Sequence, residues 1–316
     1  MTRGKPAVAG SQDAGSVELC GVRLRGPVLN GSGTFDAIAA RRAFGDALLE
    51  RFPFDCFVSK TITVDPRLGN PPPRLWEAPA GMINSIGLPN KGLERFLCDD
   101  LPQLADLPVP LCVSVMGFDP EEVGRLVEAV GARPEVALIE LNVSCPNVET
   151  GTIVGSDPAE TAALLAHVRR LTEAPLIVKL TPSATDPAAV AAAAEDHGAD
   201  AVSLINTLKG MALHPRTGEP WLGGTTGGLS GPAVRAVAVE QVAAVARAVS
   251  IPVIGMGGVD GGRDAADLLA AGSRAVAVGT ESFRDPAAGR RIKTELRALR
   301  GAGDASGDHA HPVPPG

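Results

Sequence analysis

Short apolar runs alternate with longer segments of helical periodicity along most of this chain. The short runs are almost continuously apolar, which is typical of strands buried on both faces of a parallel sheet. Eight such strands are predicted, at Pro27–Gly31, Cys56–Lys60, Pro110–Val115, Val136–Asn142, Leu176–Leu180, Ala201–Asn206, Pro252–Gly255 and Ala275–Gly279. The longer segments repeat Ala, Leu and Val at helical spacing, and most begin with a proline, whose missing N–H costs nothing in a first helical turn. These predicted helices span Pro120–Val130, Pro158–Leu171, Pro187–His197, Pro232–Val249 and Arg263–Ala271.

The strand–helix repeats predict an α/β fold, a (β/α)8 TIM barrel, with a doubly wound sheet as the alternative. The barrel is favoured because polar, glycine-rich segments follow every strand, where a barrel has its catalytic face. One domain, residues 17–300, carries all the repeats, and a hairpin at Val17–Leu24 is expected to plug the barrel bottom. Residues 1–16 and 301–316 are rich in small and polar residues without periodicity, so both are expected to be disordered tails.

Two insertions interrupt the repeats. Thr61–Lys91 follows the second predicted strand, and Leu208–Ser230 follows the sixth. Both are longer than ordinary connecting loops. Because both follow strands, we expect both at the C-terminal mouth of the barrel, as walls or lids of a substrate site.

The composition excludes several classes of protein. Hydrophobic residues make up 45% of the chain and aromatic residues only 3%, which indicates a largely aliphatic core. A net charge of −7 without a basic run argues against a nucleic-acid surface. Five cysteines without CxxC spacing argue against a metal or iron–sulfur site in this chain and are typical of a reducing compartment. No apolar run approaches the ~20 residues that span a bilayer, and no apolar signal segment begins the chain, so we expect a cytoplasmic protein without membrane contact.

The strongest chemical signal lies at the end of the fourth predicted strand, in Ile139–Asn147. Within six residues this segment carries the polar groups of Asn142, Ser144, Cys145 and Asn147. A thiol between amides can act as a proton-transfer base once a nearby cation lowers its pKa. Buried cysteines are more often structural, but the polar neighbours of this one favour an exposed loop and a catalytic Cys145.

Two lysines also end predicted strands. Lys60 and Lys179 either reach solvent and pair with carboxylates, or hold an anion or an electron-rich ring at the barrel mouth. Asn84–Leu88 in the first insertion and Asn206–Thr207 after the sixth strand add amide and hydroxyl groups. Because amides both donate and accept, we expect a flat ligand with alternating C=O and N–H groups, such as a pyrimidine-like ring.

Glycine-rich segments follow the last three strands, at Gly227–Pro232, Gly255–Val259 and Gly279–Thr280. Each alone is explained equally well by a tight turn. The loops after the seventh and eighth strands of such barrels often bind a phosphate through backbone N–H groups. Together they predict a phosphate-bearing ligand such as FMN or a sugar phosphate.

Taken in order, these motifs resemble the class 1 dihydroorotate dehydrogenases, most of all the class 1B catalytic subunit. The resemblance covers about residues 17–300. It rests on Lys60–Thr61, Gly69–Pro71 with Pro73–Arg74, Gly81–Leu88, Leu141–Asn147, Ile205–Thr207, Gly227–Pro232, Gly255–Val259 and Ala277–Thr280. The chain departs from the family pattern at Ser114, where the family has Asn, and in a shorter loop at Val148–Gly155.

The resemblance implies the FMN-dependent oxidation of dihydroorotate to orotate in pyrimidine (UMP) biosynthesis. By that resemblance, Cys145 takes the C5 proton while a hydride passes from C6 to FMN. It implies that the substrate is held by Lys60, Asn84, Ser85, Ile86, Gly87, Leu88, Asn142, Asn206 and Thr207. It implies that FMN is held by Ser32, Lys60, Thr61, Asn142, Lys179, Ile205, Gly231, Gly257, Gly258, Gly279 and Thr280.

The resemblance also implies partners. Class 1B subunits work with a second subunit that carries FAD and a [2Fe–2S] cluster and passes electrons to NAD; the cysteines for such a cluster are lacking here. A homodimer is the family expectation, and the electron acceptor stays open among NAD, fumarate and other oxidants. Two alternatives remain: a related FMN-dependent dihydropyrimidine dehydrogenase acting on uracil-type rings, and a non-catalytic flavin-binding barrel.

Overall fold

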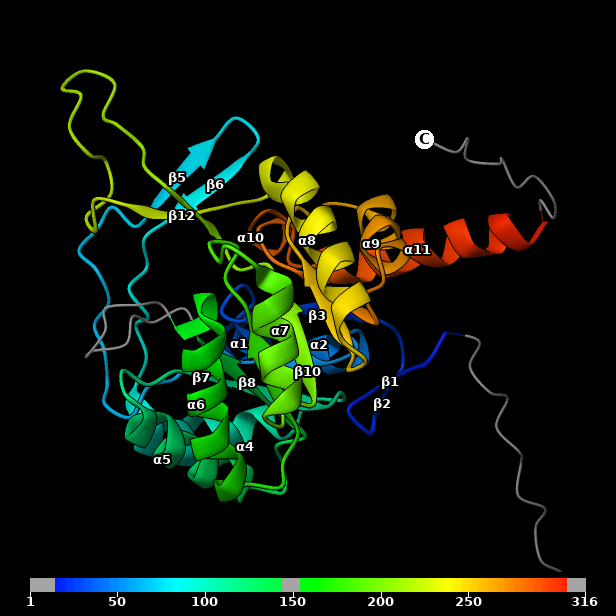
Figure 1. Ribbon diagram of the computed structural model, residues 1–316. Helices are drawn as coiled ribbons and strands as arrows, with labels where there is room; N and C mark the ends of the chain where they lie inside the picture. The colour runs from blue at the N-terminus through cyan, green and yellow to red at the C-terminus, as the bar shows by residue number, and fades with distance from the viewer. Residues whose placement is uncertain (1–14, 144–153, 306–316) are drawn as a thin grey trace, which may run out of the picture.

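The eight predicted strands form one parallel barrel, in which they follow one another in chain order (Figure 1). The computed structural model describes residues 15–143 and 154–305. The barrel strands are β3 (Val28–Asn30), β4 (Phe57–Val58), β7 (Leu111–Val115), β8 (Leu138–Asn142), β9 (Leu176–Lys179), β10 (Ala201–Leu204), β13 (Val253–Met256) and β14 (Ala275–Val278). The (β/α)8 prediction is therefore confirmed.

The seam between β3 and β4 closes the barrel. Both strands are short, and a single parallel bridge, Leu29 to Cys56, joins their backbones. The buried amide of Asn30 completes the seam, because its Nδ2 donates to Val58 O (2.7 Å) and its Oδ1 accepts from Val58 N (2.9 Å). A side-chain amide carries the same donor and acceptor as a peptide, so Asn30 continues the ladder across the gap.

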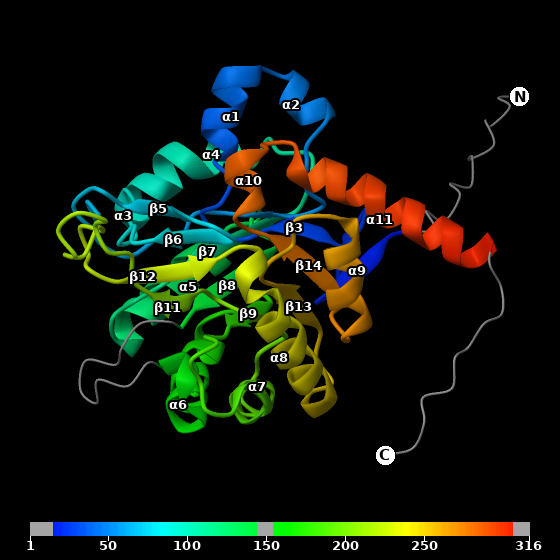
Figure 2. The ribbon, with the colours of Figure 1, turned by 90° about the horizontal axis from the view of Figure 1, so that it is seen from above.

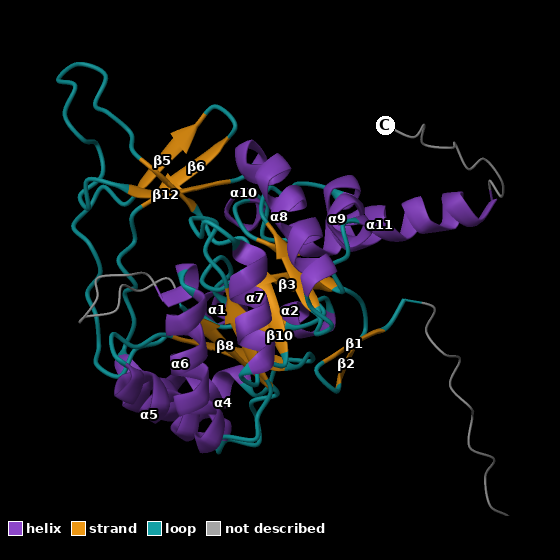
Figure 3. Cartoon of the chain, in the orientation of Figure 1, coloured by secondary structure: helices purple, strands orange, loops and turns teal. Residues whose placement is uncertain are grey.

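The predicted helices lie on the outside of this barrel (Figure 3). They are α5 (Pro120–Gly131), α6 (Pro158–Val168) with the 3-10 turn η3 (Arg169–Leu171), α7 (Pro187–Asp196), η4 (Pro232–Val234) with α8 (Arg235–Ala248), and α9 (Gly262–Ala270). Three of them begin with an Asp–Pro pair. The carboxylates of Asp119, Asp157 and Asp186 accept N–H groups of the first turn, which satisfies donors that a helix start leaves free.

Several elements were not predicted. They are α1 (Ala37–Phe44), α2 (Ala47–Glu50), α3 (Gly92–Arg95), the π-helical η1 (Phe96–Asp100), α4 (Leu101–Leu104), η2 (Val154–Ser156), α10 (Glu281–Arg284) and α11 (Ala288–Ala305). Helix α11 takes in the first residues of the segment predicted as a C-terminal tail, 301–305, while residues 1–14 and 306–316 lie outside the described residues. None of the described helices is long and apolar enough to cross a bilayer.

The bottom of the barrel is plugged as predicted. The antiparallel hairpin of β1 (Val17–Leu19) and β2 (Val22–Leu24) buries Leu19 and Leu24 completely. These leucines pack in one cluster with inward-facing strand residues such as Leu138. A second, larger cluster fills the space between the strands and the outer helices.

The two insertions meet at the opposite end and pair with each other. They form a four-stranded antiparallel sheet in the order β11 (Leu208–Gly210), β12 (Gly227–Ser230), β6 (Gly81–Asn84) and β5 (Leu75–Ala78) (Figure 2). Ile83 of this sheet packs in a small apolar cluster with Leu222. The expectation that both insertions lie over one mouth is confirmed.

A buried ion pair ties the last helix to the barrel. The carboxylate of Asp55 is 4% exposed; its Oδ1 lies 3.1 Å from Lys293 Nζ of α11, and its Oδ2 accepts from Val28 N. Removing one partner of such a pair leaves an uncompensated buried charge. The exposed pair of Arg263 and Asp267, at 3.2 Å on α9, has no such penalty.

We expect Lys293→Met to lower the free energy of unfolding by about 3 kcal/mol, because Asp55 loses its counter-charge inside the protein. The control Arg263→Ala should lower it by less than about 1 kcal/mol. Urea unfolding of the two variants measures both values. Equal losses would mean that the buried pair contributes no more than the surface pair.

Candidate active site

One cavity of about 410 Å³ lies at the carboxyl ends of the barrel strands, beneath the sheet formed by the insertions. Every predicted site residue that the structure describes lines it: Ser32, Lys60, Thr61, Asn84, Ser85, Ile86, Gly87, Leu88, Asn142, Lys179, Ile205, Asn206, Thr207, Gly231, Gly257, Gly258, Gly279 and Thr280. Ser144, Cys145 and Asn147 lie outside the described residues. Residues from distant parts of the sequence are thus brought into one site, while their individual roles stay predictions.

Two lysine ammonium groups lie in this cavity. Lys179, at the end of β9, is 6% exposed, and its Nζ donates to Ser32 Oγ at 3.0 Å. Burial, and then the charge of Lys179, lowers the pKa of Lys60. Neither ammonium forms an ion pair with a carboxylate of the described residues. Such a pair of cations favours an anionic or electron-rich ligand between the loops that carry it.

The lysine of the second strand is held by a close approach of the backbone. Gly33 has a φ of +73°, and a Cβ on it would lie 2.8 Å from Lys60 Cδ. Glycine is therefore required both for the left-handed backbone and for the space that the lysine stem occupies. The loop after β3 thus positions the cation that follows β4.

Asn142 points to a ligand with an N–H donor. Its Oδ1 is buried and has no hydrogen-bond partner within the described part of the chain. The residue ends β8 and lies beside Lys179 in the parallel register. A buried acceptor without a donor is unfavourable, so a bound ring N–H would satisfy it.

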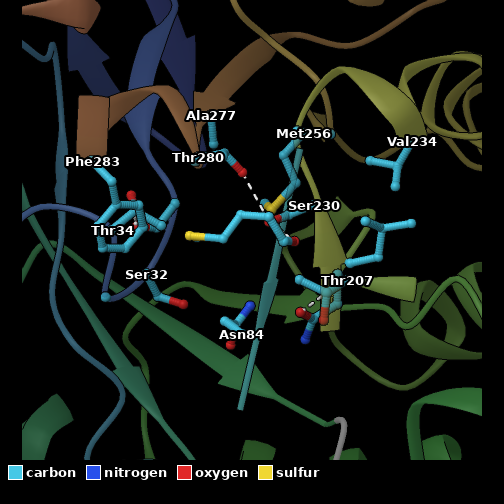
Figure 4. A pocket seen from close by; sticks show the side chains of 18 of the residues that line it. Ser32, Thr34, Asn84, Thr207, Ser230, Val234, Met256, Ala277, Thr280 and Phe283 are labelled. Atoms are coloured by element: carbon cyan, nitrogen blue, oxygen red, sulfur yellow. Dashed lines mark hydrogen bonds between the residues drawn. The ribbon is translucent and has the colours of Figure 1, made fainter. Parts of the chain in front are cut away.

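The other amides are partly engaged. Asn84 Nδ2 donates to Gly228 O at 3.2 Å, and Asn206 Oδ1 accepts from Thr207 N at 2.8 Å. These contacts orient one side chain from the first insertion and one from the segment that follows β10. Figure 4 shows Ser32, Asn84 and Thr207 around one part of the cavity.

The predicted phosphate loops come together at another part of the cavity. Thr280 Oγ1 donates to Ser230 Oγ at 2.8 Å, which joins the loop after β14 to the end of β12 (Figure 4). Gly231, Gly257 and Gly258 all have positive φ values, of +94°, +124° and +74°. A Cβ on Gly258 would lie 3.0 Å from the Cα and 3.1 Å from the N of Arg235, at the start of α8. This backbone cradle is typical of a site that binds phosphate through N–H groups.

A buried carboxylate supports the floor of the cavity, and the sequence reasoning missed it. Glu140, 3% exposed within β8, accepts from Ser114 Oγ at 3.0 Å and from Ser203 Oγ at 3.3 Å. Ser114 Oγ also lies 3.0 Å from Thr61 Oγ1, in a residue that lines the cavity. Ser114, the departure from the family pattern, belongs to this network and does not itself line the cavity. The signal that could have revealed it is a glutamate inside an otherwise apolar strand.

The described cysteines offer no thiolate to the cavity, since none of them lines it. Burial raises the pKa of Cys56 to about 12 and that of Cys112 well above its ordinary value. Burial, and then the charge of Asp200, raises that of Cys20 to about 12. Cys98 is exposed on η1. Among the cysteines of the chain, only Cys145 stays a candidate for the base.

Comparisons with known proteins agree over the whole barrel. The model of the dihydroorotate dehydrogenase family matches residues 15–299. A protein of Pelobacter propionicus is 47% identical over 279 residues, which cover 88% of this chain and 90% of that protein. A protein of Trichlorobacter lovleyi is 43% identical over 298 residues, covering 92% and 96%. Each is named dihydroorotate dehydrogenase B (NAD(+)), catalytic subunit.

We expect Gly258→Ala to weaken the binding of FMN by about tenfold or more while leaving riboflavin, which lacks the phosphate, nearly unchanged. The reason is that the added Cβ displaces the cradle from the start of α8. Gly218→Ala is the matched control, because Gly218 has the same φ of +74° but open space around it. Fluorescence titration of both flavins measures the affinities. An equal loss for riboflavin would contradict a phosphate role.

Proposed function

The chain belongs to the dihydroorotate dehydrogenase family, a family of oxidoreductases, and we propose that it oxidises dihydroorotate to orotate in pyrimidine biosynthesis. The observation that carries this proposal is the cavity that all the described residues predicted to hold substrate and FMN line together. The two ammonium groups in this cavity suit a substrate that bears a carboxylate, which uracil-type rings lack. This charge pattern favours dihydroorotate over the uracil-type substrate.

We propose FMN as the cofactor. When bound, FMN supplies the hydride acceptor that no amino-acid side chain provides. Its phosphate would be held by Gly231, Gly257, Gly258, Gly279 and Thr280, and its ring system by Ser32, Lys60, Thr61, Asn142, Lys179 and Ile205. The unsatisfied Asn142 Oδ1, the two ammonium groups and the glycine cradle support this fit.

The substrate would be held by Lys60, Asn142, Asn206, Thr207 and the loop 84–88. Leu88 in this loop has a φ of +54°, which non-glycine residues rarely adopt and which often marks functional sites. Lys60 would neutralise the carboxylate, while the amides match the ring C=O and N–H groups. Together these contacts would hold the carboxylate and the ring polar groups in place, and so would orient ring C5 and C6 for reaction.

We propose Cys145 as the general base that removes the C5 proton when its thiolate faces the ring. A nearby ammonium group favours the thiolate, because an opposite charge stabilises it. Cys145 lies outside the described residues, so this role is supported by the family motif and by the absence of another described cysteine from the cavity lining.

We further propose that the chain acts with a separate electron-transfer subunit. The relatives are named catalytic subunits of an NAD(+) enzyme, and such a partner would carry FAD and a [2Fe–2S] cluster. The homodimer and the cytoplasmic location stay predictions.

Anaerobic addition of dihydroorotate to the FMN-loaded protein tests the proposed reaction. We expect the flavin absorbance to bleach with dihydroorotate and to stay unchanged with dihydrouracil. A protein that cannot be reconstituted with FMN, or that is reduced only by dihydrouracil, would overturn the proposal.

Cys145→Ala should lower the rate of flavin reduction by dihydroorotate by about a hundredfold or more, because general-base catalysis contributes on that scale. FMN should remain bound, since the glycine cradle is built from other loops. The control Cys98→Ala removes an exposed thiol on η1 and should leave the rate unchanged. Unchanged reduction in Cys145→Ala would remove Cys145 as the base.

Because of Lys60, the affinity for orotate should fall as the pH rises into the alkaline range. The pKa of Lys60 is lowered from the ordinary value of 10.5, so its charge is present below the lowered pKa and is lost as the pH rises through it. Orotate affinity should therefore fall at a lower pH than an exposed lysine would produce. In Lys60→Arg the charge persists, because guanidinium keeps its proton above pH 12. Calorimetric titration measures both profiles, and an identical alkaline fall in Lys60→Arg would assign it to another group.

A further inference from the structure

A hydrogen-bonded cluster joins the two insertions beside the substrate end of the cavity, and Asn70 lies at its centre. We infer that Asn70 is a positioning residue that latches the loop 84–88 to the second insertion and thereby sets the affinity for the substrate. Asn70 does not line the cavity, whereas Asn84 and Ser85 to Leu88 do. The inference rests on the proposed function for the identity of the ligand.

Asn70 holds the loop through both its backbone and its side chain. Its backbone N donates to Ile86 O at 3.0 Å. Its Nδ2 donates to Ser85 Oγ at 3.0 Å and to Ser85 O at 3.2 Å. The loop that is expected to contact substrate is thus fixed at two successive residues by one asparagine.

The serine of the loop carries the connection onward to the second insertion. Ser85 is 6% exposed, and its Oγ donates to Thr226 O at 2.8 Å. A hydroxyl has one proton, so the proton of Ser85 is used within the protein. The side chain of Ser85 therefore serves the latch.

Two glycines let the insertions close on Asn70. A Cβ on Gly87 would lie 2.4 Å from Asn70 Oδ1, and Gly87 has a φ of +74°. A Cβ on Gly224 would lie 2.6 Å from Asn70 Nδ2 and 2.3 Å from Ser85 Oγ. Any larger residue on either side would push the asparagine or the serine away. The cluster is therefore packed from both insertions as well as hydrogen-bonded.

Asn70 is itself anchored within the first insertion. Arg74 Nε donates to Asn70 O at 2.5 Å, and Arg74 Nη2 donates to Leu68 O at 2.9 Å. A further backbone bond, Gly223 N to Pro73 O at 2.9 Å, joins the insertions next to the latch. The latch thus links an anchored turn to the loop 84–88, which the backbone bond from Ser85 N to Arg74 O at 2.8 Å also joins to the same insertion.

Loss of the Nδ2 donor would leave Ser85 O and Oγ without it and would allow the loop to leave its binding position. A smaller population of the competent loop raises the apparent dissociation constant in proportion. We expect Asn70→Ala and the equally sized Asn70→Asp to weaken orotate binding by about tenfold or more. The Michaelis constant for dihydroorotate should rise similarly, with little change in kcat.

Leu68→Ala is the matched control, because Leu68 lies two residues away and is 92% exposed, and its backbone contact with Arg74 remains. It should leave orotate binding unchanged. Gly224→Ala disrupts the latch from the second insertion, because its added Cβ would collide with Asn70 and Ser85. It should also weaken orotate binding. FMN affinity should stay unchanged in all four variants, because none of the hydrogen bonds of Asn70 and Ser85 given above involves a residue of the phosphate cradle.

Calorimetric titration of the FMN-loaded proteins with orotate, together with amide hydrogen exchange of residues 84–88 and 223–226, tests the inference. Faster exchange in both segments with weaker orotate binding in the Asn70 variants supports the latch. Unchanged exchange or unchanged orotate binding overturns it, as does a parallel loss of FMN. If the unsubstituted protein fails to bind orotate, the proposed function fails, and the exchange of the two segments still decides whether Asn70 joins the insertions.

Discussion

The seam between β3 and β4 is the constraint on which the site depends. The two strands share one backbone bridge, and the Asn30 amide supplies two further hydrogen bonds to Val58. Closure at this seam sets the loop after β3 against the residue that follows β4. Gly33 and Lys60 are thereby brought into contact, and Ser32 reaches Lys179 across the mouth. A barrel open at this point would separate the two ammonium groups from the loop that holds them.

Charge and hydrogen bonding are unevenly satisfied around the cavity. Beneath the mouth, Glu140 has serine donors on both of its oxygens, so that neutral hydroxyl groups stabilise the buried carboxylate. At the mouth, the ammonium groups lack described carboxylate partners and Asn142 Oδ1 lacks a described donor. A fully paired floor gives rigidity, whereas unpaired groups above it favour a ligand. The deeper groups in the barrel therefore support the site, whereas the groups at the mouth are the ones available to a ligand.

The antiparallel sheet over the mouth extends this division. Its strands come from both insertions, and the pairing of β12 with β6 holds the two insertions together. The cluster of Asn70, Ser85 and Thr226 connects the same two insertions a second time, through the Ser85 hydroxyl and the Thr226 carbonyl. The cavity therefore lies between two layers, the parallel barrel strands below and the antiparallel sheet of the two insertions above.

The sequence by itself determined the barrel, its helices α5 to α9, the plug, the place of both insertions and many of the residues that line the cavity. Apolar runs and helical spacing report the burial of each local segment, and the loops that follow parallel strands must share one rim. The sequence did not predict the contacts between residues far apart in the chain. These are the Asn30 seam, the floor around Glu140, the pairing of β6 with β12 and the latch at Asn70. The lowered pKa of Lys60 is of the same kind, because it arises from burial and from Lys179. Local periodicity contains no information on such distances, and only the packing of the folded chain decided them.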